Sequence, residues 1–184
     1  MNSLLLLLDL PSQIQNSDTD VRLIAAANGA IGVARSAGIS VGFARVAFRA
    51  GHPEVSPRNT LFRGVAAADS LVEGRPDSEY NSAIDTQATD LLVTKRRVSA
   101  FSGSDLGTII RARDVDRLVV GGTWTRGAVL STVCSAADLD LEVVVLDDVT
   151  SDPDPVVQDA LLNSILPLYA SVMSTMAWAE SLAD

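Results

Sequence analysis

The chain has little of several residue types on which whole classes of proteins depend. Its 184 residues include one cysteine, one histidine and 4% aromatic residues, and 14 lysines and arginines stand against 23 aspartates and glutamates. A single cysteine permits no internal disulfide, which favours a reducing, cytoplasmic compartment. The net charge of −9 disfavours a nucleic-acid partner, because the phosphates would be repelled. A small anionic ligand stays possible, since one local lysine or arginine can bind it.

The single histidine narrows the chemistry further. A Ser–His or Cys–His pair could form only if His52 itself supplied the base, and a histidine-rich metal site cannot form. His52 stands beside Pro53 in an irregular stretch, where we expect a solvated loop side chain.

The apolar run near the N-terminus, residues 4–8, is too short to cross a membrane. It also lacks the basic start and the small-residue cleavage site of a signal peptide. We interpret it as a buried strand, and we expect no membrane partner.

The chain is rich in aliphatic residues, and strand-like apolar runs alternate with helical patterns along it. Hydrophobic residues make up 47% of the sequence, which suits one well-buried domain over residues 1–184. Apolar runs predict strands at residues 4–9, 41–46, 90–94, 117–121, 142–146 and 171–175. Helical patterns lie between them, at residues 17–36, 105–112, 127–139, 154–166 and 176–182. This alternation predicts an α/β fold, a three-layer αβα sandwich around a mostly parallel, roughly six-stranded sheet.

Two finer expectations follow from the pattern. The first helix should bury one side at helical spacing, formed by Val21, Ile24, Ala27 and Ile31. The Pro- and Gly-containing residues 47–87 should form short helical pieces and loops that cover the ligand side of the sheet.

Residues 118–149 have the strand, turn, helix and strand of a parallel βαβ crossover. Ligands bind beyond the carboxyl ends of parallel strands, so the turn at residues 122–127 is a candidate site. Free N–H groups at the start of the helix suit an anion or an oxyanion. The alternative is an ordinary glycine-rich connection. The spacing matches neither the dinucleotide fingerprint nor the phosphate-binding loop, so we expect no nucleotide cofactor.

Asp9 and Lys95 each follow a predicted buried strand. A carboxylate there can act as a general acid or base, and a nearby ammonium can keep it ionised or hold an anionic substrate. Alternatively, each residue simply ends its strand in solvent and the two never meet. Charged strand ends are common, so the residues alone favour this second interpretation.

The first helical residue after the turn is where a nucleophile normally stands, and here it is Ala128. Cys134 lies six residues further on, turned by about 240° on the helix, so we expect a small buried packing residue. Trp124 should either pack on the sheet edge or form a wall of the pocket. Arg45 and Arg49 could contact an anion, although surface arginines are the better interpretation.

Three segments, each at a strand end, resemble the isochorismatase-like hydrolase superfamily, also called the cysteine hydrolase family. LLLLD at residues 5–9 is similar to the family's first strand and catalytic aspartate. VTKRRVSAF at residues 93–101, with SDL at residues 104–106, is similar to its lysine segment. GTWTRGAV at residues 122–129 is similar to its nucleophile turn and helix, in the form nearest to N-carbamoylsarcosine amidohydrolase-like members.

The resemblance implies an Asp–Lys–Cys site with catalytic Asp9 and Lys95 and with Ala128 at the position of the cysteine nucleophile. Alanine cannot form a thioester. Pro11 is a second departure, because many members have glutamine there. The resemblance further implies a homodimer or homotetramer, a small-molecule substrate, and substrate contacts at four residues of the turn: Trp124, Thr125, Arg126 and Gly127.

Residues 46–49 lack the Asp-x-His motif that binds metal in nicotinamidase-type members, so neither zinc nor another cofactor is expected. Three hypotheses remain. The first is a hydrolase that uses Asp9 and Lys95 without a covalent step, as in the members that cleave the vinyl ether of isochorismate. The second is a non-catalytic relative that binds a ligand or assembles. The third is a Cys-to-Ala variant of an amidase-type hydrolase. We place the hydrolase first, because the aspartate and the lysine are both present.

Overall fold

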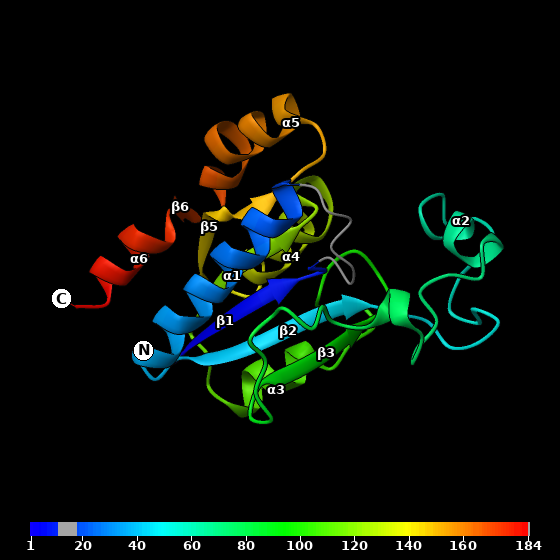
Figure 1. Ribbon diagram of the computed structural model, residues 1–184, viewed down its shortest axis with the longest axis horizontal. Helices are drawn as coiled ribbons and strands as arrows, with labels where there is room; N and C mark the ends of the chain where they lie inside the picture. The colour runs from blue at the N-terminus through cyan, green and yellow to red at the C-terminus, as the bar shows by residue number, and fades with distance from the viewer. Residues whose placement is uncertain (11–17, 184) are drawn as a thin grey trace.

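The computed structural model describes residues 1–10 and 18–183 and contains a six-stranded parallel sheet at its centre (Figure 1). Pro11, which differs from the family pattern, and Ser17, at the start of the first predicted helix, lie outside the described residues. The strand order is β3-β2-β1-β4-β5-β6. The strands are β1 (Ser3–Leu8), β2 (Ser40–Val46), β3 (Leu91–Lys95), β4 (Arg117–Thr123), β5 (Glu142–Ser151) and β6 (Ser171–Met173).

Helices cover both faces of the sheet, which confirms the predicted three-layer architecture. The α-helices are α1 (Asp18–Ser36), α2 (Phe62–Ala67), α3 (Leu106–Ala112), α4 (Leu130–Ala137), α5 (Pro155–Ala160) and α6 (Thr175–Ser181). Shorter 3₁₀ or π turns are η1 (Pro76–Ser78), η2 (Thr125–Val129), η3 (Leu161–Ile165) and η4 (Leu166–Leu168). None of the helices in the described part of the chain has the length and apolar character needed to cross a bilayer.

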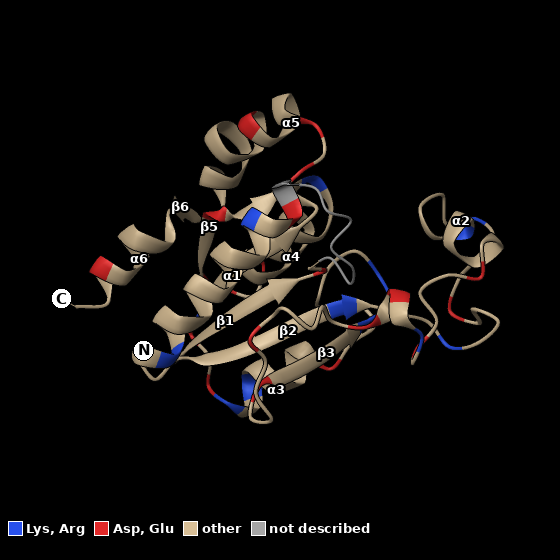
Figure 2. Ribbon diagram, viewed as in Figure 1, with Lys and Arg blue, Asp and Glu red and all other residues tan. Residues whose placement is uncertain are grey.

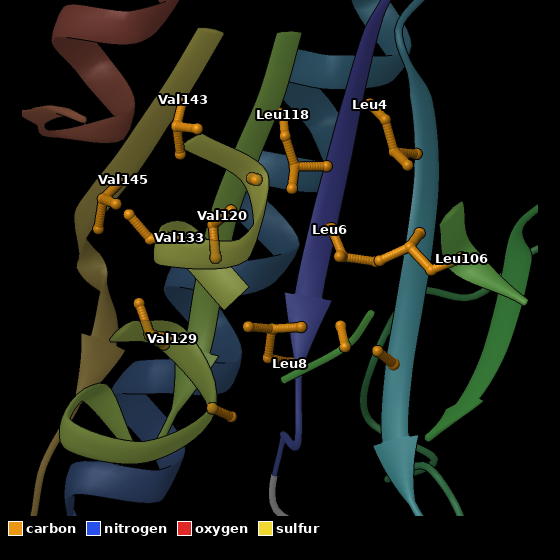
Figure 3. Packing of buried hydrophobic residues seen from close by; sticks show 14 of the residues in the cluster. Leu4, Leu6, Leu8, Leu106, Leu118, Val120, Val129, Val133, Val143 and Val145 are labelled. Atoms are coloured by element: carbon orange, nitrogen blue, oxygen red, sulfur yellow. The ribbon is translucent and has the colours of Figure 1, made fainter. Parts of the chain in front are cut away.

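The leucine run of β1 packs into two separate cores. Successive side chains of a strand point to opposite faces, so Leu4, Leu6 and Leu8 join the core under α3 and α4, which Figure 3 shows. Leu5 and Leu7 pack on the other face, against α1 and α6. Burial on both faces explains why β1 is continuously apolar rather than alternating.

Two local predictions were wrong. Val21 is exposed, because the buried stripe of α1 runs through Leu23, Ile24, Ala27, Ala30, Ile31 and Ala34, and Val21 lies roughly 120° from its centre at 100° per residue. β5 does not end at residue 146: its pairing with β4 shifts register after Val120 and resumes where Gly122 lies beside Thr150.

Residues 49–75, here called the arm, extend beyond the carboxyl end of β2 and carry α2 (Figure 1). The arm has a small core of its own. The ring of His52 lies 5.4 Å from that of Phe48, and its Nε2 lies 2.7 Å from the Ser70 carbonyl oxygen. His52 is therefore only 5% exposed, and the prediction of a solvated loop histidine was wrong. The short helical pieces predicted for this stretch are present as α2 and η1.

Gly122 occupies a position that only glycine fits. Its φ is 128°, a backbone conformation that is essentially restricted to glycine. A Cβ atom there would lie 2.0 Å from the carbonyl oxygen of Leu8. The close approach of β4 to β1 at this point brings the turn after β4 next to Asp9.

We therefore expect Gly122→Ala to lower the free energy of unfolding by more than about 3 kcal/mol, because it combines backbone strain with a steric clash. Urea denaturation measures the change. Gly32→Ala is the matched control: nothing lies within 4 Å of the added Cβ, and alanine should stabilise α1 by about 0.5–1 kcal/mol. Equal stability of the two variants would contradict the assignment.

Candidate functional site

Contacts with β2 and β4 hold Asp9 directly after β1. Its N–H donates to the Ala44 carbonyl oxygen at 2.8 Å, and its Oδ1 accepts the N–H of Val46 at 2.9 Å. Its own carbonyl oxygen accepts the hydroxyl of Thr123. Asp9 has a φ of 44°, a left-handed conformation that aspartate adopts more readily than most residues. These contacts leave Oδ2 for an interaction with β3.

That interaction is an ion pair with Lys95. The Lys95 Nζ lies 2.7 Å from Asp9 Oδ2 and also donates to the carbonyl oxygen of Arg97 at 3.3 Å. Lys95 is the only lysine in the chain and is 1% exposed. A buried ammonium requires a charged partner, and Asp9 supplies it across the intervening β2. The interpretation that the two strand ends never meet was wrong, whereas their catalytic roles stay predictions.

Burial raises the pKa of Asp9 above its usual value, because desolvation disfavours the carboxylate. The charge and hydrogen bond of Lys95 and the N–H of Val46 act in the opposite direction and lower this pKa without cancelling the effect of burial. A carboxyl group with a raised pKa can both accept and return a proton closer to neutral pH than an ordinary aspartate.

The turn after β4 is helical from Thr125, earlier than the predicted start at residue 127. Ala128 is buried in this turn. The N–H of Arg126 donates to Asp152 Oδ2, and that of Gly127 donates to the carbonyl oxygen of Trp124. Two of the N–H groups expected to be free are therefore occupied, so an oxyanion would have to use others of this turn, among which those of Thr125 and Ala128 are candidates.

The four predicted substrate-contacting residues of the turn differ in their surroundings. Thr125 is 0% exposed, and its hydroxyl has no hydrogen-bond partner among the described residues. A buried hydroxyl without a partner is suited to a ligand atom. Trp124 is 58% exposed, so its ring is not buried against the sheet edge. Gly127 is half-buried beside Ala128.

Arg126 is neutralised by a carboxylate. Its Nε lies 2.8 Å and 2.9 Å from the two carboxylate oxygens of Asp152, and its terminal nitrogen contacts the same side chain. This pairing lowers the pKa of Asp152. A guanidinium engaged in this way has little net charge left for a substrate, and the role of Arg126 in substrate binding stays a prediction.

Hydroxyl groups connect the loop after Lys95 to α4. The Thr132 Oγ1 accepts the N–H of Ala100 at 2.9 Å, and the Ser99 and Ser135 hydroxyls lie 2.9 Å apart. Sequence reasoning assigned no role to these contacts, although two small polar residues three apart on one helix are a detectable signal. Through them α4, which follows Ala128, and the segment that follows Lys95 keep a common position.

Cys134 lies on the same helix and is half-buried, so the prediction of a small buried packing residue was only partly right. Burial raises the pKa of its thiol, which keeps it protonated and unreactive at neutral pH. Groups of three or more His, Cys, Asp or Glu side chains placed to hold a metal are not found within residues 1–10 and 18–183. The expectation that no metal is used stays a prediction.

Comparison with known proteins decides the family. Residues 3–177 match the family model described as the isochorismatase domain. This chain belongs to the isochorismatase family. The prediction made from the three motifs is confirmed for the family and for the fold, and the equivalence of Ala128 to a cysteine nucleophile stays a prediction.

Two curated relatives of this isochorismatase-family chain are named as amidohydrolases. The chain is 32% identical over 174 residues to ureidoacrylate amidohydrolase RutB of Stutzerimonas stutzeri, covering 88% of this chain and 70% of the relative. It is 23% identical over 154 residues to maleamate amidohydrolase of Pseudomonas putida, covering 84% and 71%. A cysteine hydrolase structure from Pseudomonas syringae superposes with a TM-score of 0.89 at 23% identity, covering 99% of this chain and 92% of that one.

The ion pair of this isochorismatase-family chain can be tested through its single lysine. In protein labelled with ¹³Cε-lysine, we expect the one lysine resonance to shift with pH as Asp9 titrates, with a midpoint above 3.8, the ordinary value. The midpoint is above that value because burial raises the pKa more than Lys95 lowers it. Asp9→Asn should abolish this pH-dependent shift of the lysine resonance, and Asp138→Asn, at an exposed aspartate, should retain it. A midpoint at or below 3.8, or an unchanged step in Asp9→Asn, would contradict the assignment.

Proposed function

We propose that this chain hydrolyses the C–N bond of a small, carboxylate-bearing amide, with Asp9 as the proton-transfer residue and water as the nucleophile. The observation that supports the proposal most directly is the buried Asp9–Lys95 pair, 2.7 Å apart, at the carboxyl edge of the sheet. Maleamate and ureidoacrylate, named in the two amidohydrolase relatives, each carry a carboxylate near an amide-type C–N bond. They are the natural starting substrates.

In the proposed reaction, Asp9 accepts a proton from water while the water oxygen bonds to the carbonyl carbon of the amide. The carbonyl electron pair moves to oxygen, and the N–H groups of Thr125 and Ala128 stabilise the resulting oxyanion. The oxyanion re-forms the carbonyl as the C–N bond breaks, and Asp9 returns its proton to the leaving nitrogen. The products are the carboxylic acid and ammonia or an amine.

Lys95 positions Asp9 and compensates its charge before the proton arrives. In this proposal Ala128 occupies the place of the family's thiol, so no thioester can form. Water must therefore approach the substrate carbon directly. The raised pKa of Asp9 suits a group that must hold the proton and then return it.

The same raised pKa favours a second candidate, the hydrolysis of a vinyl ether. Asp9 in its protonated form would deliver the proton to a vinyl carbon, and water would add to the adjacent carbon. The hemiketal so formed then breaks into a carbonyl compound and an alcohol. No covalent intermediate is needed in this route either.

Ammonia release from maleamate, measured for the wild type and three variants, tests the proposal. We expect slow turnover by the wild type and a loss of at least about 100-fold in Asp9→Asn, because removing a general base costs roughly 10²–10⁴ in rate. Asp138→Asn, at the exposed aspartate directly after α4, should keep wild-type activity.

Ala128→Cys separates the alternatives. If Ala128→Cys hydrolyses maleamate and ureidoacrylate while the wild type hydrolyses neither, the direct-water proposal is overturned. That result would support a scaffold that lacks its nucleophile. If both proteins are inert with amides, the amidase proposal is wrong, and vinyl ethers decide the second candidate. Absence of turnover with both substrate classes would identify a non-catalytic relative.

A further inference from the structure

A carboxylate-bearing substrate needs a cation that is free to bind it, and most cations at this end of the sheet are already paired with acids. Figure 2 shows basic and acidic segments side by side around the carboxyl end of β2. The pairs in this region are Arg45 with Glu79, Arg49 with Glu54, Arg96 with Glu73, Lys95 with Asp9, and Arg126 with Asp152.

Arg97 is the exception next to the site. Its guanidinium donates to the carbonyl oxygens of Arg96 at 2.6 Å and Glu54 at 2.9 Å. Within the described part of the chain, no carboxylate lies within ion-pair distance of it. Carbonyl oxygens orient a guanidinium without neutralising it, and arginine stays charged at any ordinary pH. The half-buried Arg97 therefore carries an uncompensated positive charge.

The backbone of Arg97 is already part of the site, because its carbonyl oxygen accepts a hydrogen bond from the Lys95 Nζ. Of the five N–H donors of the guanidinium, two are used on the carbonyl oxygens, and the others can form paired bonds to a carboxylate. The contact with the Glu54 carbonyl also fixes the guanidinium relative to the arm, so it is held in place before a ligand arrives.

The balance of charges around the site also leaves Arg97 as the cation available to a substrate carboxylate. Asp9 and Lys95 together are neutral, and Arg126 is matched by Asp152. The chain as a whole carries −9 and repels anions at long range. A monoanionic substrate can therefore be held only by a local cation, and Arg97 supplies one positive charge for one carboxylate.

We propose that Arg97 forms an anion subsite that binds the carboxylate of the substrate and selects for it over neutral amides. The inference rests on the proposed substrate class, but it concerns binding and can be tested without turnover. Arg97 also replaces Arg126 as the residue that binds the substrate's charge.

Maleate titrated into ¹³Cε-lysine protein tests the subsite, since the single lysine resonance reports from the site itself. We expect saturable shifts with the wild type, at least about tenfold weaker binding with Arg97→Gln, and partial recovery with Arg97→Lys, which keeps the charge but loses the planar fork. Arg58→Gln, at an exposed arginine of the arm, should bind as the wild type does. A neutral diamide of the same skeleton should bind equally to the wild type and to Arg97→Gln.

Equal maleate affinity in the wild type and Arg97→Gln would overturn the inference, provided that circular dichroism shows both to be folded. The inference would also be overturned if the lysine resonance of the wild type did not shift at about 50 mM maleate. Binding weaker than that would be too weak to matter for a substrate. Arg97-dependent maleate binding without hydrolysis of maleamate would support the subsite and count against the proposed function. Hydrolysis of maleamate at the same rate by the wild type and by Arg97→Gln would support the proposed function and count against the subsite.

Discussion

The buried ion pair between Asp9 and Lys95 is the interaction on which the site depends. A lysine that is 1% exposed cannot stay charged without a partner, and the half-buried carboxylate of Asp9 supplies the compensating charge. The two residues belong to strands separated by β2, so their contact requires the strand order β3-β2-β1 and ends aligned at one edge. Removing either partner would leave a buried charge uncompensated, which is far more costly than never having placed the pair.

The same edge of the sheet imposes the local geometry around the pair. Gly122 allows β4 to approach Leu8 more closely than any residue with a Cβ could. The hydroxyl of Thr123 then reaches the carbonyl oxygen of Asp9, and the N–H of Val46 holds its Oδ1. Asp9 is thus held from two neighbouring strands, at its backbone by β4 and at its carboxylate by β2, while Oδ2 faces Lys95. Backbone and side-chain contacts therefore fix the position of Asp9. The turn that contains Ala128 follows directly after β4.

Local sequence patterns were sufficient for the fold, because apolar runs and helical periodicity depend on near neighbours, and three ordered motifs were sufficient for the family. They could not show which strand ends meet, since strand order is a property of the whole chain. Arg126 had the type and position of an anion-binding residue, but its partner Asp152 lies 26 residues away. His52 had a loop composition, yet a core built by Phe48 buries it. Both surroundings depend on contacts outside the local pattern: Asp152 for Arg126, and the Ser70 carbonyl, 18 residues away, for His52.

Under the proposed function, alanine rather than a thiol at position 128 changes what Asp9 has to do. Water is a far weaker acid than a thiol, so complete removal of a proton from water is far more unfavourable than deprotonation of a thiol. A free hydroxide cannot therefore be an intermediate at an aspartate. Under the proposed function, proton transfer to Asp9 must accompany bond formation between water and the substrate carbon. That requirement gives a role to the raised pKa of Asp9 and to a substrate held rigidly through its carboxylate, because a concerted step tolerates little misalignment.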